Sequence, residues 1–290
     1  MAYENDGRSS GFGFRILIAI AMAIFGLFSY YSHTEVNPVT GEKQHISLTT
    51  EQEIALGLQA APEMAAEMGG EVTATDSQSQ LVKSIGQKVW QNSDAHRSPY
   101  QFDFHLLADS KTINAFALPG GQVFITRGLL DKLENEAQLA GVLGHEIGHV
   151  INRHAAEHMA KGQLGQLLAG AAGVATTDNR RGMSGQIVAQ AVNQMTQLKF
   201  SRNDESEADD FGLKYMTQSG YDPRAMLGVM QILQEASRGN RQPEFLETHP
   251  YPEARMEKVK SFLAKTYPQG VPEYLTQGRP LNSPQNVKFR

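Results

Sequence analysis

Residues 141–158 read GVLGHEIGHVINRHAAEH and contain residue types that together could bind a metal ion. His145 and His149 are four positions apart, so on a helix they lie on one face, one turn from each other. Two imidazoles placed in this way can share a zinc ion. Glu146 lies about 100° further around the helix, where it can reach a water on that ion but cannot easily be a third ligand. The pattern HEIGH therefore predicts a hydrolytic zinc centre with Glu146 as its general base.

A second candidate pair follows in HAAEH, where His154 and His158 flank Glu157 in the reverse order that is also known from zinc sites. On one continuous helix His154 lies about 140° from His149, so the two pairs cannot face the same site. HEIGH is flanked by apolar residues on both sides, whereas HAAEH is polar and close to the expected helix end. We therefore favour His145 and His149, and expect the second pair to lie at a solvated or hydrogen-bonded helix end.

A catalytic zinc ion needs a third protein ligand and an open fourth position. The chain has no cysteine, so this ligand is His, Asp or Glu, and the acidic segment RNDESEADDFG at 202–212 is its best source. Carboxylates are also favoured at the start of a helix by the helix dipole alone. Spacing leaves Asp204, Glu205, Glu207 and Asp209 open as ligands. Glu205 and Asp209 share a helix face, so one could bind the metal while the other supports a histidine through its free N–H.

The helix expected to carry HEIGH contains Gly141, Gly144 and Gly148. A glycine inside a helix costs about 1 kcal/mol relative to alanine. Three glycines spaced three and four apart make one smooth stripe, so another part of the chain must approach closely there. We expect that part to be the sheet that precedes the helix.

The apolar pattern before this helix predicts two helices and a small sheet. Thr50 and Glu53 suggest a capping box at the start of the first helix, and a second helix follows Asp76. The segment YQFDFHLLA at 100–108 is expected to be extended, and INAFALPGGQVFITRGLL to form two strands joined near residues 119–121.

From about Glu134 the pattern is helical and runs to about Lys161. Residues 162–186 are rich in glycine and predict a flexible connection, although the apolar run LLAGAAGVA within them could contact a membrane or a partner. Further helices are expected at 187–200, 203–219, 223–238 and 252–266. The predicted fold class is α+β and mostly helical, with a small sheet placed before the histidine helix.

The N-terminal segment ILIAIAMAIFGLFSYY, residues 16–31, carries no charge. It is shorter than the ~20 residues that usually span a membrane, but long for the apolar region of a signal peptide. No A-x-A cleavage site follows it, and Tyr30 and Tyr31 are typical of a membrane interface. We therefore favour an uncleaved anchor over a cleaved signal. Arg8 and Arg15 favour a cytoplasmic N-terminus, which would leave the rest of the chain outside the inner membrane.

The chain of 290 residues thus divides into a leader at 1–15, an anchor or signal at 16–31, a linker at 32–49 and one domain at 50–290. The net charge is −5 and no basic stripe is present, so no nucleic-acid partner is expected. The absence of cysteine excludes disulfides, thiolate zinc sites and a cysteine nucleophile. The sequence gives no indication of an oligomeric state.

HEIGH, then ESEAD in the pattern E-x-x-A-D, then HPYPEAR occur in this order. Together they resemble the zinc metalloendopeptidases that include the Ste-type CaaX prenyl proteases, HtpX, BepA, LoiP and the mitochondrial Oma peptidase. The resemblance covers about residues 75–265 and implies a zincin-like fold with one Zn²⁺ per chain. The many-helix membrane bodies of the prenyl proteases and HtpX have no counterpart here. Processing of prenylated substrates is therefore not expected, and the compact extracytoplasmic quality-control members match better.

The resemblance also implies roles for individual residues. His145, His149 and Glu205 match the three zinc ligands, Glu146 matches the catalytic base, and Asp209 matches the aspartate that supports a histidine ligand.

His249 and Arg255 match a pair near the substrate oxyanion, and in some relatives this histidine occupies the open zinc position as a plug. Asn114 and Ala115 match an edge strand that binds the substrate backbone, a role that suits an exposed strand because main-chain hydrogen bonds demand little of the substrate sequence.

The function expected from these residues and this resemblance is zinc-dependent hydrolysis of peptide bonds in unfolded or misassembled proteins. The enzyme would sit in the bacterial inner membrane with its catalytic domain on the periplasmic side, or be exported as a soluble periplasmic protein. One alternative is a zinc-bound chaperone or adaptor that is held shut by His249. A further alternative is hydrolysis of a non-peptide amide or ester at the same site.

Overall fold

The computed structural model describes residues 9–176, 198–238, 243–250 and 252–281. Its N-terminal half contains α1 (Ser9–Ser32), β1 (Thr34–Val36), β2 (Lys43–His45), α2 (Thr50–Glu67), α3 (Ser77–Gln91), the short 3₁₀ helix η1 (Asp94–Arg97), β3 (Asp103–Leu107), β4 (Ala115–Leu118), β5 (Gln122–Thr126) and α4 (Arg127–Leu130). The elements that follow are α5 (Glu136–Ile151), α6 (His154–Thr176), α8 (Arg202–Gln218), α9 (Ala225–Ser237), α10 (Glu244–Thr248) and α11 (Pro252–Thr266). The fold is mostly helical with small sheets, which confirms the predicted class.

The main sheet has three strands in the order β3-β5-β4. β3 runs parallel to β5, and β4 pairs with β5 as an antiparallel hairpin, as the Pro-Gly-Gly turn signal predicted. The turn bends sharply at Gly120, which has φ +84°, and a Cβ there would lie only 2.4 Å from the Cα of Ile54 in α2. Because β4 is the last strand in the order β3-β5-β4, it is an edge strand, and one side of its backbone faces away from β5.

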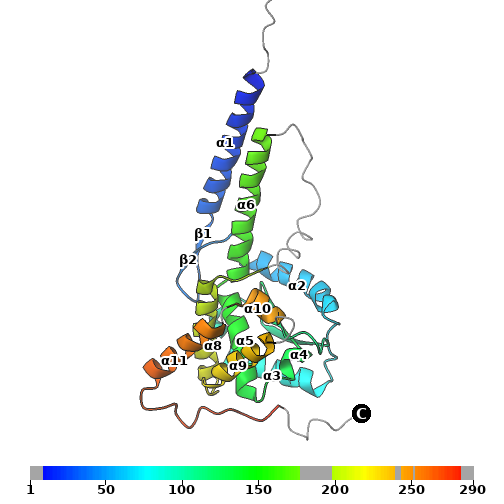
Figure 1. Ribbon diagram of the computed structural model, residues 1–290, viewed down its shortest axis with the longest axis vertical. Helices are drawn as coiled ribbons and strands as arrows, with labels where there is room; N and C mark the ends of the chain where they lie inside the picture. Colours follow the sequence, from blue (N-terminus) through cyan, green and yellow to red (C-terminus); the bar gives the residue numbers. More distant parts are fainter. Residues whose placement is uncertain (1–8, 177–197, 239–242, 251, 282–290) are drawn as a thin grey trace, which may run out of the picture.

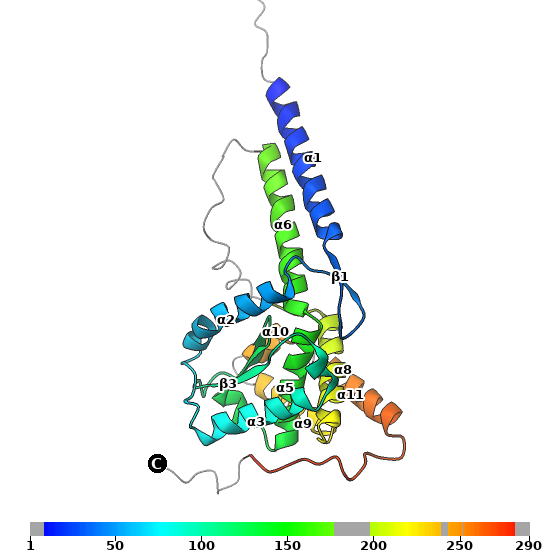
Figure 2. The same ribbon diagram turned by 180° about the vertical axis from the view of Figure 1, so that it is seen from behind.

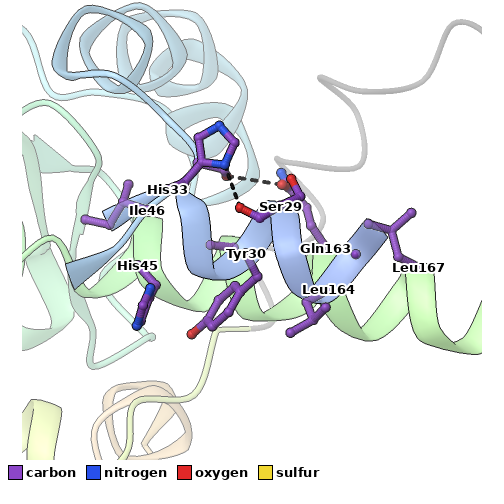
Figure 3. Close-up of a pocket in the computed structure, with 11 residues that line it drawn as sticks. Ser29, Tyr30, His33, His45, Ile46, Gln163, Leu164 and Leu167 are labelled. Carbon is purple, nitrogen blue, oxygen red and sulfur yellow. Dashed lines mark hydrogen bonds between the residues drawn. The ribbon is translucent and has the colours of Figure 1, made fainter. Parts of the chain in front are cut away.

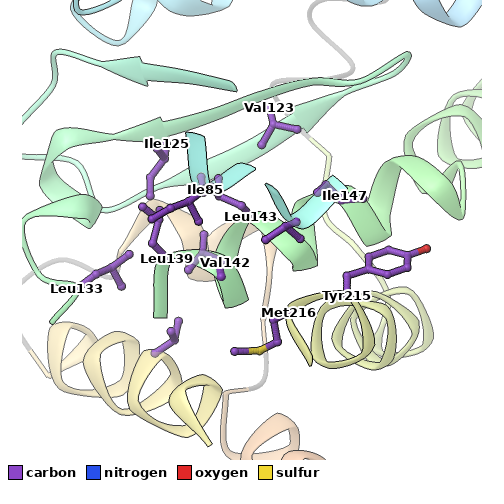
Figure 4. Close-up of a cluster of buried hydrophobic side chains, with 14 of the residues drawn as sticks. Ile85, Val123, Ile125, Leu133, Leu139, Val142, Leu143, Ile147, Tyr215 and Met216 are labelled. Atoms are coloured by element: carbon purple, nitrogen blue, oxygen red, sulfur yellow. The ribbon is translucent and has the colours of Figure 1, made fainter. Parts of the chain in front are cut away.

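α5 carries HEIGH through the centre of the domain. Almost every side chain from its first turn to its last is buried. Leu139, Leu143 and Ile147 lie in one hydrophobic cluster with residues of α3, the sheet, α8 and α9 (Figure 4). The expected rigid and dry platform for the two histidines is present, because one helix surrounded on all sides by packed elements has little freedom to move.

The glycines of α5 face α8, and the expectation that the preceding sheet approaches this stripe is wrong. A Cβ at Gly144 would lie 3.2 Å from the backbone oxygen of Gly212, and one at Gly148 would lie 3.0 Å from that of Ala208. Gly141 instead contacts the sulfur atoms of two methionines from α8 and α9. Small residues on both helices let their backbones come close together. This contact sets the distance between the histidines of α5 and the carboxylates of α8.

The predicted continuous helix from about Glu134 to Lys161 is interrupted. α5 ends at Ile151 with Asn152 as its C-cap, and Arg153 has φ +56°, in the left-handed region that ends helices. α6 then starts at His154 as a separate helix and projects from the domain (Figure 1). The angle of about 140° between His149 and His154 assumed one continuous helix. Because the helix is interrupted, His154 need not lie on the opposite face from His149.

Two other predictions from the sequence need correction, and a third lies mostly outside the described residues. The capping box of α2 is formed by Thr49 and Gln52, one residue earlier than expected, because Thr49 accepts from the Gln52 N–H and donates its own N–H to the Gln52 side chain. The flexible connection predicted at 162–186 is helical as far as Thr176, and its remainder lies outside the described residues. Of the helix predicted at 187–200, only residues 198–200 are described, and they are not helical.

The remaining helices start close to the predicted positions. Asp76 caps α3 with two backbone hydrogen bonds. α8, α9 and α11 begin within two residues of 203, 223 and 252.

α1 and α6 stand side by side and project from the domain in both views (Figures 1 and 2). Of the described residues, one segment, Gly13–Ser32, is long and apolar enough to cross a membrane. Residues 32–49, predicted as a linker, hold the hairpin β1–β2. This hairpin is attached to the end of α5, because Asn37 and Gln44 donate side-chain hydrogen bonds to the carbonyls of Ile151 and Asn152.

Candidate metal centre

Three elements bring together four metal-binding side chains in the interior of the domain. α5 supplies His145 and His149, α8 supplies Glu205, and the residue that ends α10 is His249. Each of the four is buried, and one ligand atom from each lies within 4.8 Å of the others. The spacing predicted the two α5 histidines as ligands, and the family resemblance implied Glu205 as the third ligand and His249 as a plug in some relatives. The structure places all four side chains in one cluster.

The distances between these donor atoms suit a single small cation. In a tetrahedral zinc site with bonds of about 2.0–2.1 Å, two donor atoms are separated by about 3.3 Å. His145 Nε2 lies 3.0 Å from His149 Nε2 and 3.4 Å from His249 Nδ1. Glu205 Oε1 lies 3.3 Å from His149 Nε2, and Glu205 Oε2 lies 3.6 Å from His145 Nε2. Three imidazole nitrogens and a carboxylate that converge in this way in a buried site provide the donor set that zinc prefers.

His145 is oriented by groups on the far side of its ring. Its Nδ1 lies 3.0 Å from Asp209 Oδ1, so the imidazole donates its N–H to this carboxylate and keeps Nε2 free for the cluster. Arg255 in turn forms a two-point interaction with Asp209, through Nε at 2.8 Å and Nη2 at 2.7 Å. The expected placement of Asp209 behind a histidine is thus present.

His149 is held by two residues that the sequence did not link to the site. His154 Nδ1 lies 2.9 Å from His149 Nδ1, and His154 Nε2 lies 3.1 Å from Glu207. Phe200 packs on the His149 ring, with the two ring centroids 4.0 Å apart. Burial lowers the pKa of His149 well below its usual value, which keeps the imidazole neutral and its lone pair available.

The second histidine pair therefore has a supporting place. His158 Nε2 binds Asp204 at 2.8 Å, and His154 binds Glu207 as described above. These contacts occupy two of the four carboxylates that spacing left open as third ligands. The helix break at Arg153 brings His154 back beside His149, and Asn152, a common residue at helix ends, was the signal in the sequence that could have revealed it.

Glu205 lies at the base of the cluster and is fully buried. Burial alone would raise the pKa of its carboxyl, but the Arg255 charge and His249 outweigh this and hold the pKa well below its usual range. Arg255 Nη1 lies 2.8 Å from Glu205 Oε2. Arg255 therefore compensates two buried carboxylates, Glu205 and Asp209, and both stay ionised.

His249 fills the fourth corner of the cluster. Its Nδ1 lies 2.9 Å from Glu205 Oε1, and its ring packs on Phe245 with the centroids 4.4 Å apart. Its Nε2 has no hydrogen-bond partner and lies 3.8 Å from Glu146 Oε1. The imidazole thus stands between the predicted base and the other three donors.

Glu146 is buried beside the cluster without belonging to it. Burial raises the pKa of its carboxyl, an effect that the nearby His249 and His145 only partly offset. Its Oε1 makes no hydrogen bond. A buried carboxyl with a raised pKa and an uncommitted oxygen is suited to accept and return a proton.

The predicted substrate strand lies next to this cluster. Ala115 begins the edge strand β4, which packs along α5. The Asn114 side chain donates a 3.0 Å hydrogen bond to Glu244 at the start of α10. A small pocket separates β4 from α5, and its lining includes residues 117–119 of the strand and turn together with His149, Arg153 and Phe200. Of the four donors, His149 therefore shares a pocket with the edge strand.

Comparison with known proteins agrees with this geometry. The model of peptidase family M48 matches residues 76–263, which contain α3, the three-stranded sheet, α5, α8 and most of α11. The chain belongs to peptidase family M48. This membership, together with the donor set, assigns zinc to the site.

Several curated M48 relatives have sequences similar to this chain. The beta-barrel assembly-enhancing protease of Escherichia coli (strain K12) is 33% identical over 70% of the chain and 43% of its own length. The protein with the same name from Yersinia pestis is 32% identical over 77% of the chain and 46% of its own length. The mitochondrial metalloendopeptidase OMA1 of Schizosaccharomyces pombe is 30% identical over 81% and 68%. The chain therefore spans less than half the length of the two bacterial relatives.

Proposed function

We propose that this chain is a zinc-dependent endopeptidase in which His145, His149 and Glu205 hold the metal. The observation that carries the proposal is the position of Glu146. Its buried carboxyl lies next to the four-donor cluster, has a raised pKa and keeps one oxygen without a hydrogen bond. A carboxylate in this position beside two histidines and a glutamate is the arrangement of a metallopeptidase base.

The residues of the chain divide the reaction between them. Zinc, when bound, supplies a Lewis acid that polarises a water and the scissile carbonyl. Glu146 takes a proton from the attacking water and returns it to the leaving amine. Asp209 keeps the Nδ1 proton of His145, and His154 supports His149 from behind, so both rings present Nε2 to the metal.

In this proposal His249 has a closed and an open position. The closed position places its Nδ1 among the zinc ligands, where it would block the site for water or substrate. Once the histidine turns out of the cluster, its imidazole is close enough to the site to stabilise the developing oxyanion. Arg255 is paired with Glu205 and Asp209, so we assign it mainly to holding these two carboxylates and only secondarily to the oxyanion.

The substrate would bind as an extra strand on β4. Ala115 begins this edge strand and Asn114 directly precedes it, and the far end of the strand shares a pocket with His149. A peptide that pairs with the β4 backbone is held in an extended conformation with little demand on its sequence. Such a mode suits unfolded or misassembled polypeptides, which is the substrate class that we propose. The bacterial relatives carry assembly-enhancing protease in their names, which is consistent with it.

We also propose that α1 anchors the chain in the bacterial inner membrane, with the catalytic domain on the periplasmic side. The support is the apolar Gly13–Ser32 segment, which is mostly exposed, together with Arg8 before it and Arg15 near its start. An exported soluble form is the alternative.

A second function, a zinc-bound chaperone or adaptor with latent peptidase activity, is favoured by one observation. His249 completes the donor set, so in this conformation no position is open for water. The two functions differ in whether this histidine can leave the cluster.

Zinc content provides the first test. We expect the purified full chain to carry one zinc per chain and to cleave an unfolded protein such as casein. Chelation should abolish cleavage and zinc should restore it. Glu205→Gln is expected to lower the bound zinc to a small fraction, because a neutral amide is a poor zinc ligand.

Glu207→Gln is the matched control, since Glu207 lies two positions away on α8, pairs with His154 and is not one of the four donors. It should retain its zinc. Equal zinc content in the two variants would contradict the assignment of Glu205 as the third ligand.

His249→Ala tests the closed position. We expect zinc to stay at one per chain, because three ligands remain, and casein cleavage to rise about tenfold if the plug is stabilised by about 1.4 kcal/mol. Steady-state cleavage and metal analysis of the same preparation provide the measurement. A lower rate with zinc retained would show that His249 assists the reaction more than it blocks it.

A further inference from the structure

α1 and α6 form an antiparallel pair outside the peptidase domain. α1 runs toward the domain and α6 runs away from it (Figures 1 and 2). They meet at Gly26, which is buried, and a Cβ there would lie 3.5 Å from Leu167 and 3.6 Å from Leu164. One turn further from the domain, Ala171 is also buried. Small residues at a helix crossing allow the close packing that holds helices together in membranes.

The domain end of this pair has the character of a membrane interface. Tyr30, His33 and His45 line a small pocket there together with Gln163 and Leu164 (Figure 3). Aromatic and polar side chains of this kind gather at the headgroup level of a bilayer. Beyond this level α1 exposes large apolar side chains on several sides, namely Phe14, Ile16, Leu17, Ile20, Ile24, Phe25, Leu27 and Phe28.

We propose that residues 164–176 of α6 enter the lipid bilayer beside α1, so that the chain is held in the membrane by two helices. No charged residue occurs between Lys161 and Asp178. At a rise of 1.5 Å per residue, α6 extends about 18 Å beyond Leu164, more than half of the ~30 Å hydrocarbon core. The one side chain with an amide beyond that level, Gln166, lies within a turn of the interface.

Lipid acyl chains are the occupant that this surface fits. α6 turns Leu164 and Leu167 toward α1, while Leu168 and Ala169 are exposed on its other side. α6 packs along α1, and α1 itself is long and apolar enough to cross a membrane. Because the two helices lie side by side, a bilayer that surrounds α1 at the level of Gly26 must also surround α6 at that level.

This arrangement would connect the membrane to the metal centre. α6 starts at His154, whose ring contacts His149, and reaches the interface ten residues later, which places the centre about 15 Å along the helix from the bilayer. The hairpin that follows α1 binds the carbonyls at the end of α5. Both membrane helices are thus attached at the junction between α5 and α6.

Single-cysteine labelling can test the inference, because the chain has no cysteine of its own. Leu168→Cys places an environment-sensitive fluorophore on the outer face of α6, and Ala169→Cys is a second variant at the neighbouring exposed position. Phe25→Cys reports on α1, and Lys161→Cys reports on the part of α6 below the interface. Each full-length variant is reconstituted in phosphatidylcholine vesicles and exposed to doxyl-labelled lipid or to aqueous iodide.

We expect doxyl lipid to quench the fluorophores at positions 168 and 169 as strongly as the one at position 25, and iodide to quench the one at position 161. Quenching at 168 and 169 by iodide, with position 25 still quenched by lipid, would overturn the proposal for α6. Lack of lipid quenching at position 25 would also overturn the proposal, because α1 itself would then not lie in the bilayer. Shielding of 168 and 169 from both quenchers would also overturn it, because a protein surface would then cover α6. None of these results depends on peptidase activity.

Discussion

Glu146→Gln is expected to lower the rate of casein cleavage by about 10³-fold, within the range observed when a general acid or base is removed. Glutamine has nearly the shape of glutamate but cannot accept a proton from water. Glu146 does not belong to the four-donor cluster, so the zinc content should not change. Cleavage rate and zinc content are measured on the same preparation of the whole chain. A truncation that removed α1 would expose the face of α6 that α1 covers.

Glu157→Gln is the matched control for this variant. Glu157 lies on α6, where it pairs with Lys161, and makes no contact with the four donors. It should cleave casein at the parent rate. If Glu146→Gln cleaves as fast as the parent, the activity comes from another protease or another base, and the proposed mechanism fails. If neither protein cleaves while zinc is bound, the latent chaperone becomes the better interpretation.

Arg153→Met is expected to produce the largest loss of stability, about 3–5 kcal/mol in the free energy of unfolding. Arg153 is buried at the junction of α5 and α6 and forms a two-point ion pair with the buried Glu53 of α2. It also binds Glu35 of β1 and the carbonyl of Leu48. The substitution leaves the Glu53 carboxylate without a cation, with only a hydrogen bond from Tyr100.

Denaturant unfolding at several pH values can measure this loss. Burial raises the pKa of Glu53, and removal of Arg153 raises it further. A carboxyl whose pKa is higher in the folded state than in the unfolded state binds protons on folding, so the variant loses stability as the pH rises. The deficit of the variant should therefore be largest at alkaline pH and shrink as the pH falls toward the usual carboxyl pKa.

Arg279→Met is the control for this second prediction. Arg279 also pairs with a glutamate, Glu136, but the Arg279 side chain is 78% exposed, so water already reaches the pair and screens its attraction. We expect a loss of less than about 1 kcal/mol. Equal losses in the two arginine variants would show that the buried pair is not the anchor of this junction.

Local patterns predicted the parts of the site that depend on one element at a time. The spacing of His145 and His149 requires one helix face, and Glu205 and Asp209 share a face for the same reason. The Pro-Gly-Gly turn between β4 and β5 was predictable because a bend with positive φ leaves few residue choices. The 3.6-residue period of the helix and the alternation of the strand are properties of the local backbone, so they can be read from the sequence.

The tertiary structure decided which of these faces meet. The contact of Gly144 and Gly148 with α8, not with the sheet, brings Glu205 to the two histidines. The left-handed Arg153 interrupts the helix between α5 and α6, and His154 then lies beside His149 and supports it instead of forming a second metal site.

The sequence by itself determined the HEIGH face, the acidic face of α8 and the apolar N-terminal segment. The family resemblance gave His249 as a plug in some relatives, but only the tertiary structure decided that it joins the cluster here, from 100 residues further along the chain. Only the tertiary structure decided, too, that residues 162–176, expected as a loop, continue α6 along α1. The physical reason is the same in both cases. These features depend on burial against distant partners, which can override local preferences such as those of the glycines in α6.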